Sequence, residues 1–175
     1  MLRLVEPAPA HKAAFLEAVS EMHAFGEWDI TPEAMAARFD DLLRELAAAK
    51  DPATAPADVL PYEDFWLFAG DVWVGLLTLR LTIDEQFLRS GGHIGYVIRP
   101  SWRRRGYGTA ILRLGLEQAR ARGLPRVLLT CAETNIASRK VIEANGGRLE
   151  NVLVVDGLPN LVRRYWIDLD SILRQ

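Results

Sequence analysis

The stretch RPSWRRRGYGTAIL, residues 99–112, combines a local excess of positive charge with two glycines. Four arginines lie within seven positions, and Gly106 and Gly108 follow at once, ahead of an apolar run that predicts a helix. The first turn of a helix has backbone N–H groups without internal partners and carries partial positive charge. Glycine there lets an anion reach the backbone, and arginine adds charge-assisted hydrogen bonds. The stretch therefore predicts an anion site, because cations at a helix N-terminus are unfavourable on their own.

The residue types in this loop exclude two common phosphate-binding motifs. The loop lacks the Gly-Lys-Ser/Thr ending of a P-loop, which argues against triphosphate chemistry with magnesium. It also fails the Gly-x-Gly-x-x-Gly dinucleotide fingerprint, because Ile111 stands where the third glycine would be. The anion site therefore belongs to a different class of glycine loop.

Length and composition predict one globular domain, residues 1–175, since half of the residues are hydrophobic and a quarter are charged. The formal net charge of −2 and the lack of a wider basic stripe argue against nucleic acid as a partner. No apolar run approaches the ~20 residues of a membrane span, so no membrane partner is expected. The single cysteine, Cys131, excludes an intrachain disulfide and predicts a cytoplasmic location. No metal site is predicted.

Hydrophobic periodicity and turn residues predict the elements that must position the anion loop. Helices are expected over 11–25, 32–50, 106–122 and 135–145, and strands over 2–5, 64–83 with a turn at 70–71, 93–100, 126–131, and around a two-residue hairpin at 156–157. The strand–helix–strand unit over 93–131 predicts a right-handed crossover and a parallel pair. The fold class is therefore α/β (mixed α+β): a central, mostly antiparallel sheet of about seven strands, with helices on both faces and one parallel β-α-β crossover.

Arg103-x-x-Gly106-x-Gly108 resembles the Arg/Gln-x-x-Gly-x-Gly/Ala signature of the GNAT superfamily of acyl-CoA-dependent N-acetyltransferases. It follows a strand that ends in proline and precedes a helix, as in that family. The block LLTCAETNIASRKVIEANGG, 128–147, is similar to the strand–Asn–helix–Gly block that completes the family's cofactor site. Together the motifs cover 93–147, and the order of the flanking elements extends the resemblance to nearly the whole chain. The sequence is similar to a bacterial branch known only as predicted acetyltransferases.

The resemblance implies acetyl-CoA as the cofactor, with its pyrophosphate on the glycine loop. The loop residues so implied are Arg103, Arg104, Arg105, Gly106, Tyr107, Gly108 and Thr109. The pantetheine arm is expected to pair, like an added strand, with the backbone of Tyr96, Val97 and Ile98. Asn135 matches the asparagine that contacts the cofactor at the start of the next helix, and Ser138 lies one turn further on.

The resemblance also implies direct transfer to a neutral amine, so a base must first take a proton. His93 is the candidate base, and the alternative for it is a structural histidine satisfied by the preceding glycine loop. Glu133 could equally order a water or cap the following helix. Many family members have a tyrosine seven residues after the asparagine as general acid, but Ile142 stands there. Ser138 is the candidate substitute, with an ordinary first-turn serine as its alternative.

The expected function is therefore transfer of an acetyl group from acetyl-CoA to a primary amine. An acyl-CoA-binding regulatory or sensor domain without turnover is the alternative, and Ile142 favours it. The acceptor pocket is expected between the first two helices, their connecting loop and the final hairpin. A small-molecule amine, a protein N-terminus and a lysine all remain open as acceptors. Exposed sheet edges are compatible with a homodimer.

Overall fold

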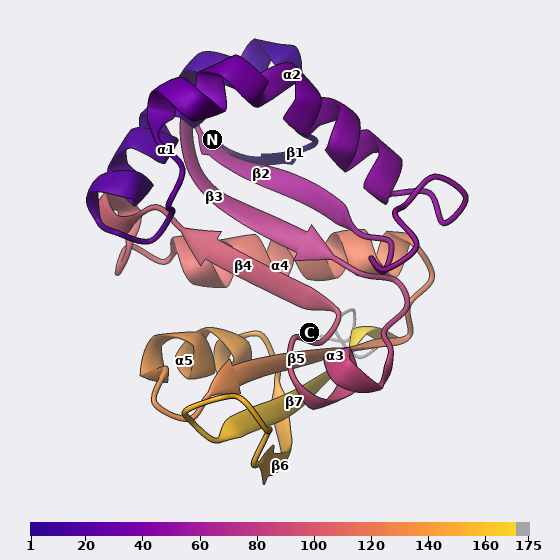
Figure 1. Cartoon of the computed structure of the whole chain (residues 1–175). Helices are drawn as coiled ribbons and strands as arrows, with labels where there is room; N and C mark the ends of the chain where they lie inside the picture. The colour runs from indigo at the N-terminus through magenta and orange to yellow at the C-terminus, as the bar shows by residue number, and fades with distance from the viewer. Residues whose placement is uncertain (171–175) are drawn as a thin grey trace.

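Seven strands form two separate antiparallel sheets in the computed structural model, which describes residues 1–170 (Figure 1). The first sheet has the order β1-β2-β3-β4, with β1 Leu2–Val5, β2 Glu63–Ala69, β3 Val72–Leu79 and β4 Ile94–Ile98. The second has the order β5-β7-β6, with β5 Arg126–Ala132, β6 Arg148–Leu153 and β7 Val162–Asp168. The helices are α1 Lys12–Ala24, α2 Pro32–Ala49, α3 Glu85–Arg89, α4 Tyr107–Ala121 and α5 Ile136–Ala144. Within the described residues, no helix is long and apolar enough to cross a membrane.

The predicted order of helices and strands is confirmed, with two differences in the connections. Helix α3, which Asp84 caps, was not predicted because five residues are too few to show a helical period. The two-residue hairpin predicted at 156–157 is wrong, since β6 ends at Leu153 and β7 begins only at Val162. Pro159, which has no N–H to donate to a ladder, lies within the longer loop.

The predicted single sheet with a parallel β4–β5 pair is not formed. Among the described residues, β4 is an edge strand, and the only pairing between the two sheets is an isolated bridge from Gly92 to Leu129. The backbones approach so closely there that a Cβ on Gly92 would lie 2.4 Å from the carbonyl oxygen of Leu128. Past this bridge the two sheets are separate, and the edge of β4 that faces β5 lacks a partner strand (Figure 1).

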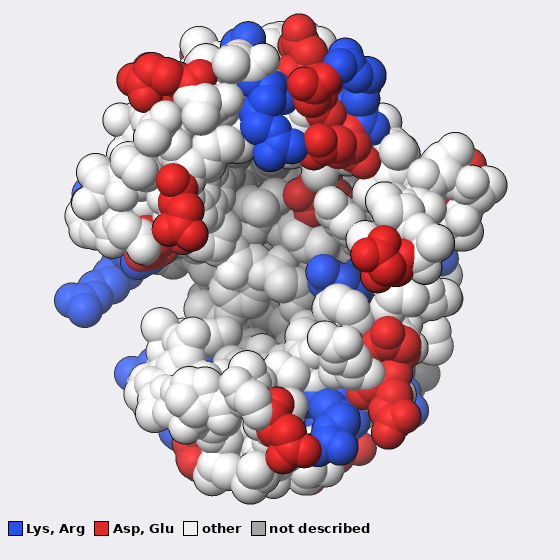
Figure 2. Space-filling view, in the orientation of Figure 1, with Lys and Arg blue, Asp and Glu red and all other residues white. Residues whose placement is uncertain are grey.

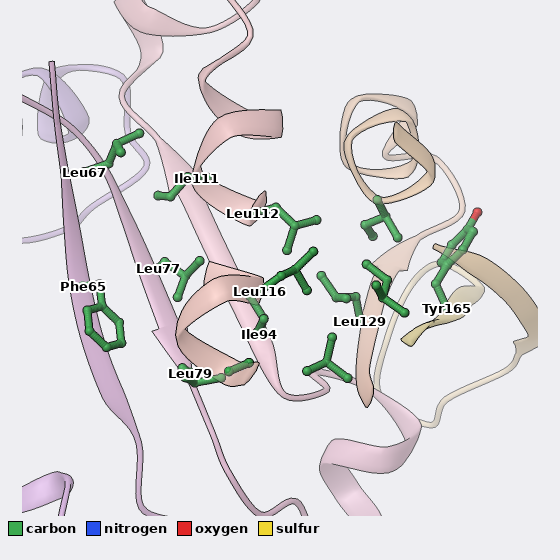
Figure 3. Packing of buried hydrophobic residues seen from close by; sticks show 14 of the residues in the cluster. Phe65, Leu67, Leu77, Leu79, Ile94, Ile111, Leu112, Leu116, Leu129 and Tyr165 are labelled. Carbon is green, nitrogen blue, oxygen red and sulfur yellow. The ribbon is translucent and has the colours of Figure 1, made fainter. Parts of the chain in front are cut away.

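Helix α4 holds the two sheets together. Its side chains Ile111, Leu112 and Leu116 are at most 3% exposed and belong to one core cluster with Leu77 of β3 and Leu129 of β5 (Figure 3). Burial of each such side chain contributes roughly 1.5–3 kcal/mol. Because this core spans both sheets, it fixes the opening between them, and the loop that leads into α4 starts where β4 ends.

Helices α1 and α2 cover the opposite face of the first sheet with a second, aromatic core. Phe15 of α1 stacks on Trp66 of β2, with ring centroids 4.2 Å apart and an interplanar angle of 11°. The other fully buried aromatic members are Phe39, Phe68 and Trp73. This core lies at one end of the sheet and leaves the rest of the face uncovered.

The uncovered part of that face forms a hollow over β3 and β4. The residues on this side, Leu76, Thr78, Gly95 and Val97, are only half buried, whereas those that face α4, Leu77, Leu79 and Ile94, are buried. Figure 2 shows the hollow between the half of the molecule that contains α1 and α2 and the half that contains α5. Most of its lining is uncharged, and charged side chains gather around its rim.

Candidate active site

The arginine loop ends in a row of backbone donors at the start of α4. Arg104 and Gly106 both adopt left-handed conformations, with φ of 59° and 83°, and turn the chain into the helix. Within the described residues, the six consecutive N–H groups of 104–109 donate to no acceptor, and the first amide that does so is that of Ala110. Amides at a helix start, with no capping side chain, are the donors that bind phosphate in proteins.

Two of the loop arginines are already paired with carboxylates of the N-terminal half. The Nε of Arg99 donates to Glu21 at 2.6 Å. The guanidinium of Arg103 forms a bidentate pair with Glu27 at 2.7 and 2.5 Å, and its Nε donates to the carbonyl of Ile98 at 2.9 Å. Arg103, which the sequence placed in the anion cradle, therefore ties the loop to the segment after α1.

The other two arginines have no such partner. Arg104 and Arg105 form no hydrogen bond or ion pair with any residue from 1 to 170. The Arg105 guanidinium lies over the ring of Trp102, 5.5 Å from its centroid, and Trp102 packs edge-on against Tyr107 at 5.3 Å. Their charge is thus available to an anion on the amides.

The backbone of β4 bonds alternately to β3 and toward the gap between the sheets. The amide of Arg80 donates to the carbonyl of His93, and the amide of Arg99 donates to the carbonyl of Val74. Hydrogen-bonded pairs alternate along an antiparallel ladder. The odd-numbered residues of 93–99 therefore bond to β3, and the even-numbered residues between them turn their backbone groups toward the gap.

Of the three residues expected to pair with an extended ligand, Tyr96, Val97 and Ile98, only two have backbone groups that face the gap. Tyr96 directs its N–H and C=O into the gap, and Ile98 directs its N–H there, since its carbonyl accepts from Arg103. Val97 lies opposite Leu76 in a hydrogen-bonded pair, so its N–H and C=O groups bond to β3. An added strand would therefore bond to Tyr96 and Ile98.

A cleft of about 430 Å³ opens between β4 and β5, within the size range of ligand pockets. Tyr96, Asn135 and Ser138 line it. The Tyr96 hydroxyl lies 2.9 Å from Ser138 Oγ. Burial raises the pKa of Tyr96 to about 12, against a smaller lowering by the Ser138 hydrogen bond. At neutral pH the phenol is therefore protonated and can donate.

Asn135 is the N-cap of α5. Its Oδ1 accepts a hydrogen bond from the Ser138 amide at 3.0 Å, which satisfies one of the free donors at the helix start. Its Nδ2 donates to no acceptor among residues 1–170, and the side chain is exposed to the cleft. The geometry thus combines a capping oxygen with a donor that remains for a ligand.

His93 is placed away from the cleft and links the two sheets. Its backbone amide donates to the carbonyl of Leu128, and its ring Nδ1 accepts from the Leu128 amide at 3.0 Å. The residue is 8% exposed, and burial lowers the pKa of its imidazole. The Nδ1 lone pair that a base would use is occupied, so the structural alternative fits His93 better than catalysis does.

Two further residues near the cleft have ordinary structural surroundings. Glu133 accepts from Arg163 at 2.9 Å. Cys131 lines the cleft, but burial raises the pKa of its thiol, which makes it a poor nucleophile. Transfer without an acyl-enzyme is consistent with that environment.

Ile142 is fully buried in the core and does not face the cleft. A Cβ on Gly147 would lie 2.4 Å from Ile142 Cγ2, so the surroundings are tightly packed. The hydroxyl that reaches the cleft is instead that of Tyr96, a residue for which the sequence predicted only a backbone contact with the cofactor. The signal was present, because strand alternation places Tyr96 on the side of Ile94 and opposite to Gly95.

The chain belongs to the GNAT acetyltransferases, the family of acetyl-CoA-dependent N-acetyltransferases that the sequence motifs resemble. Residues 1–148 match the family model described as "Acetyltransferase (GNAT) domain". No curated protein sequence matches the chain.

Solved structures share this fold at low sequence identity. RimJ of Mycobacterium smegmatis, in complex with CoA-disulfide, has a TM-score of 0.73 and 23% identity over 99% of this chain and 84% of that chain. RimL, a ribosomal L7/L12 alpha-N-protein acetyltransferase in complex with coenzyme A, has a TM-score of 0.66 and 19% identity over 97% and 95% of the two chains. A spermidine N-acetyltransferase SpeG chimera from Vibrio cholerae and hSSAT has a TM-score of 0.67 and 16% identity over 99% of each chain. At these identities the likeness establishes the fold alone.

Proposed function

We propose that this protein transfers an acetyl group from acetyl-CoA directly to a primary amine. The observation that carries the proposal is the run of six N–H groups at 104–109 that find no acceptor among residues 1–170, directly after the strand whose edge lies open. A helix N-terminus suits a phosphate, and an open strand edge suits an extended chain with amide groups. Acyl-coenzyme A contains both, a pyrophosphate and an amide-bearing arm.

The residues present fit this cofactor in a consistent order along the cleft. The amides of 104–109 and the two unpaired arginines of the loop would hold the pyrophosphate. The backbone groups of Tyr96 and Ile98 that face the gap would pair with the pantetheine arm, and Asn135 Nδ2 adds a donor. When bound, the cofactor supplies the acetyl group as a thioester.

The Tyr96–Ser138 pair supplies a proton donor at the cleft. Tyr96 stays protonated at neutral pH, and Ser138 fixes the direction of its hydroxyl through the 2.9 Å contact. A thiol leaving group titrates near ~8.5 and needs little help from an acid. As the amine nitrogen bonds to the acetyl carbon and the C–S bond breaks, the nitrogen gives its proton to water in the open cleft. The pair is proposed to donate a proton to the leaving sulfur, which assists its departure by a modest factor.

The position of Ile142 weakens the argument for a sensor domain without turnover. Ile142 lies in the core and is not among the residues that line the cleft. The Tyr96 hydroxyl on β4 is the donor proposed in its place.

Thermal melting with acetyl-CoA, desulfo-CoA and ATP tests the cofactor assignment. The two CoA compounds are expected to raise Tm by several degrees through mass action, and ATP is not. No shift with either CoA compound would overturn the proposal. CoA release over a panel of primary amines then tests turnover, and a clear shift without any release above background hydrolysis would instead indicate a sensor.

A further inference from the structure

One row of residues crosses three strands on the floor of the hollow. Asp64 of β2 lies opposite Thr78 of β3, which in turn lies opposite Gly95 of β4. The Thr78 hydroxyl donates to Asp64 Oδ1 at 2.6 Å. Directly opposed residues point to the same face, and a Cβ built on Gly95 would meet nothing within 4 Å. The row therefore ends in open space next to the cleft that Gly95 also lines.

A second row lies two residues further along the same strands. Arg80 continues β3, and its guanidinium lies 4.3 Å from the ring centroid of Phe87 and 5.9 Å from that of Tyr62. Within residues 1–170, the guanidinium makes no hydrogen bond and no ion pair. Arg80 is half buried, so this is a partly desolvated cation with all of its donors free.

The Asp64 carboxylate and the Arg80 guanidinium are close enough to influence each other electrostatically, yet they form no ion pair. Burial raises the pKa of Asp64 and lowers the pKa of Arg80, so both charges carry a desolvation cost. Buried charges are normally paired because that cost is large, and these two half-buried groups carry part of it. Asp64 and Arg80 are diagonal neighbours on adjacent strands, and such pairs lie roughly 7–8 Å apart, a separation that one ligand can bridge.

We propose that the hollow binds an acceptor whose primary amine lies near a carboxylate or carbonyl oxygen, as in an amino acid or a peptide N-terminus. The ammonium group binds at Asp64 and Thr78, in the space over Gly95, and the oxygen binds the free donors of Arg80. A polyamine fits this arrangement poorly, because its second ammonium would lie beside Arg80. This inference rests on the proposed acetyl transfer and specifies its acceptor.

The test compares acceptors that differ in one group. CoA release is measured with the twenty amino acids, with tripeptides that carry each residue at the N-terminus, with the amines formed by decarboxylation of those amino acids, and with spermidine. We expect turnover in the first two groups, and the better of the two identifies whether a free amino acid or a peptide supplies the amine. Spermidine as the best acceptor, or no turnover in either of the first two groups, would overturn the inference.

Arg80→Gln then tests the recognition of the oxygen. KM for the best acceptor is expected to rise about tenfold, the loss typical of a charge-assisted hydrogen bond, while KM for its decarboxylated amine changes less than twofold. Arg80→Lys, which keeps the charge, should recover part of the loss. Arg113→Gln, on the exposed side of α4, is the matched control and should change neither KM. An unchanged KM in Arg80→Gln would contradict the assignment.

Asp64→Asn tests the ammonium subsite. It is expected to raise KM about tenfold for both the acceptor and its decarboxylated amine, because both carry the ammonium. The melting shift with acetyl-CoA serves as the independent readout. If Arg80 and Asp64 variants keep that shift and the KM pattern is absent, the acceptor inference fails alone. If the wild-type protein shows no shift, the proposed function itself fails.

Discussion

The hydroxyl of Tyr96 and the Oγ of Ser138 lie 2.9 Å apart, and this contact joins β4 to α5 across the cleft. Either oxygen can be the donor in this pair. Ser138 was the donor candidate from the sequence, and Tyr96 was considered for its backbone alone. The structure makes the two side chains one hydrogen-bonded unit, so kinetics must separate their roles.

Tyr96→Phe is expected to lower kcat about tenfold, below the roughly hundredfold or more that general acid catalysis typically contributes, because a thiol leaves readily. Ser138→Ala should lower kcat less than tenfold, since it leaves the phenol in place but frees its orientation. Acetyl-CoA affinity, measured by calorimetry, should stay within twofold in both variants. A larger loss in Ser138→Ala than in Tyr96→Phe would reverse the roles, and unchanged kcat in both would remove the pair from the mechanism.

Gly106→Ala tests the amide cradle at the start of α4, with Gly123→Ala as its control. Both glycines have φ between 83° and 86°, both have open space where a Cβ would point, and they flank the same helix. A left-handed alanine should lower the free energy of unfolding by about 1 kcal/mol at either position. Only Gly106→Ala is expected to weaken acetyl-CoA binding, by about tenfold, because the cradle must shift. Equal affinity in the two variants would count against the cradle.

Arg104→Gly is expected to stabilise the protein and weaken its function. Arg104 has φ of 59°, a conformation that costs a residue with a side chain about 1–2 kcal/mol of stability. Glycine removes this cost but loses more conformational entropy on folding, so only part of it is gained. We expect a gain of roughly 0.5–1 kcal/mol in urea denaturation, together with a severalfold weaker acetyl-CoA affinity from loss of the guanidinium. Arg104→Lys keeps both the charge and the conformation, so its stability should match that of the wild-type protein. A glycine variant no more stable than the lysine variant would show that the loop relaxes without strain.

Local signals predicted most of the elements. The predicted start of α2 at residue 32 is confirmed, and the Ala34 amide donates there to Thr31 Oγ1 at 3.2 Å. The apolar run of β5 and the glycine-rich entry to α4 were likewise visible in neighbouring residues. Each of these features depends on a few consecutive positions, which is what sequence patterns record.

The features that the sequence did not predict depend on distant residues. Side-chain alternation indicates which face of a strand is buried, but it does not indicate which strand lies at its edge, so the separation of β4 from β5 was missed. The pairs Arg103–Glu27 and Tyr96–Ser138 join residues 76 and 42 positions apart. Their assembly follows from how α4 packs between the sheets, and no local motif contains that information.

His93 offers a test of its structural role through pH. Burial lowers the pKa of His93 below its usual 6.5, with a smaller contribution from Arg126, and the Leu128 amide occupies Nδ1. The unfolded chain therefore binds a proton more readily than the folded one. The stabilisation is complete above about pH 6.5 and is lost as the pH falls toward the lowered pKa, by up to about 1.4 kcal/mol per pH unit.

His93→Asn removes this titration and keeps an oxygen that can accept from the Leu128 amide. Urea denaturation at pH 7, 6 and 5 should show a shallower loss of stability in this variant than in the wild-type protein, because only the wild-type histidine gains a proton on unfolding. His23→Asn, at an exposed histidine, is the matched substitution control. Equal slopes for His93→Asn and the wild-type protein would mean that His93 does not titrate with unfolding.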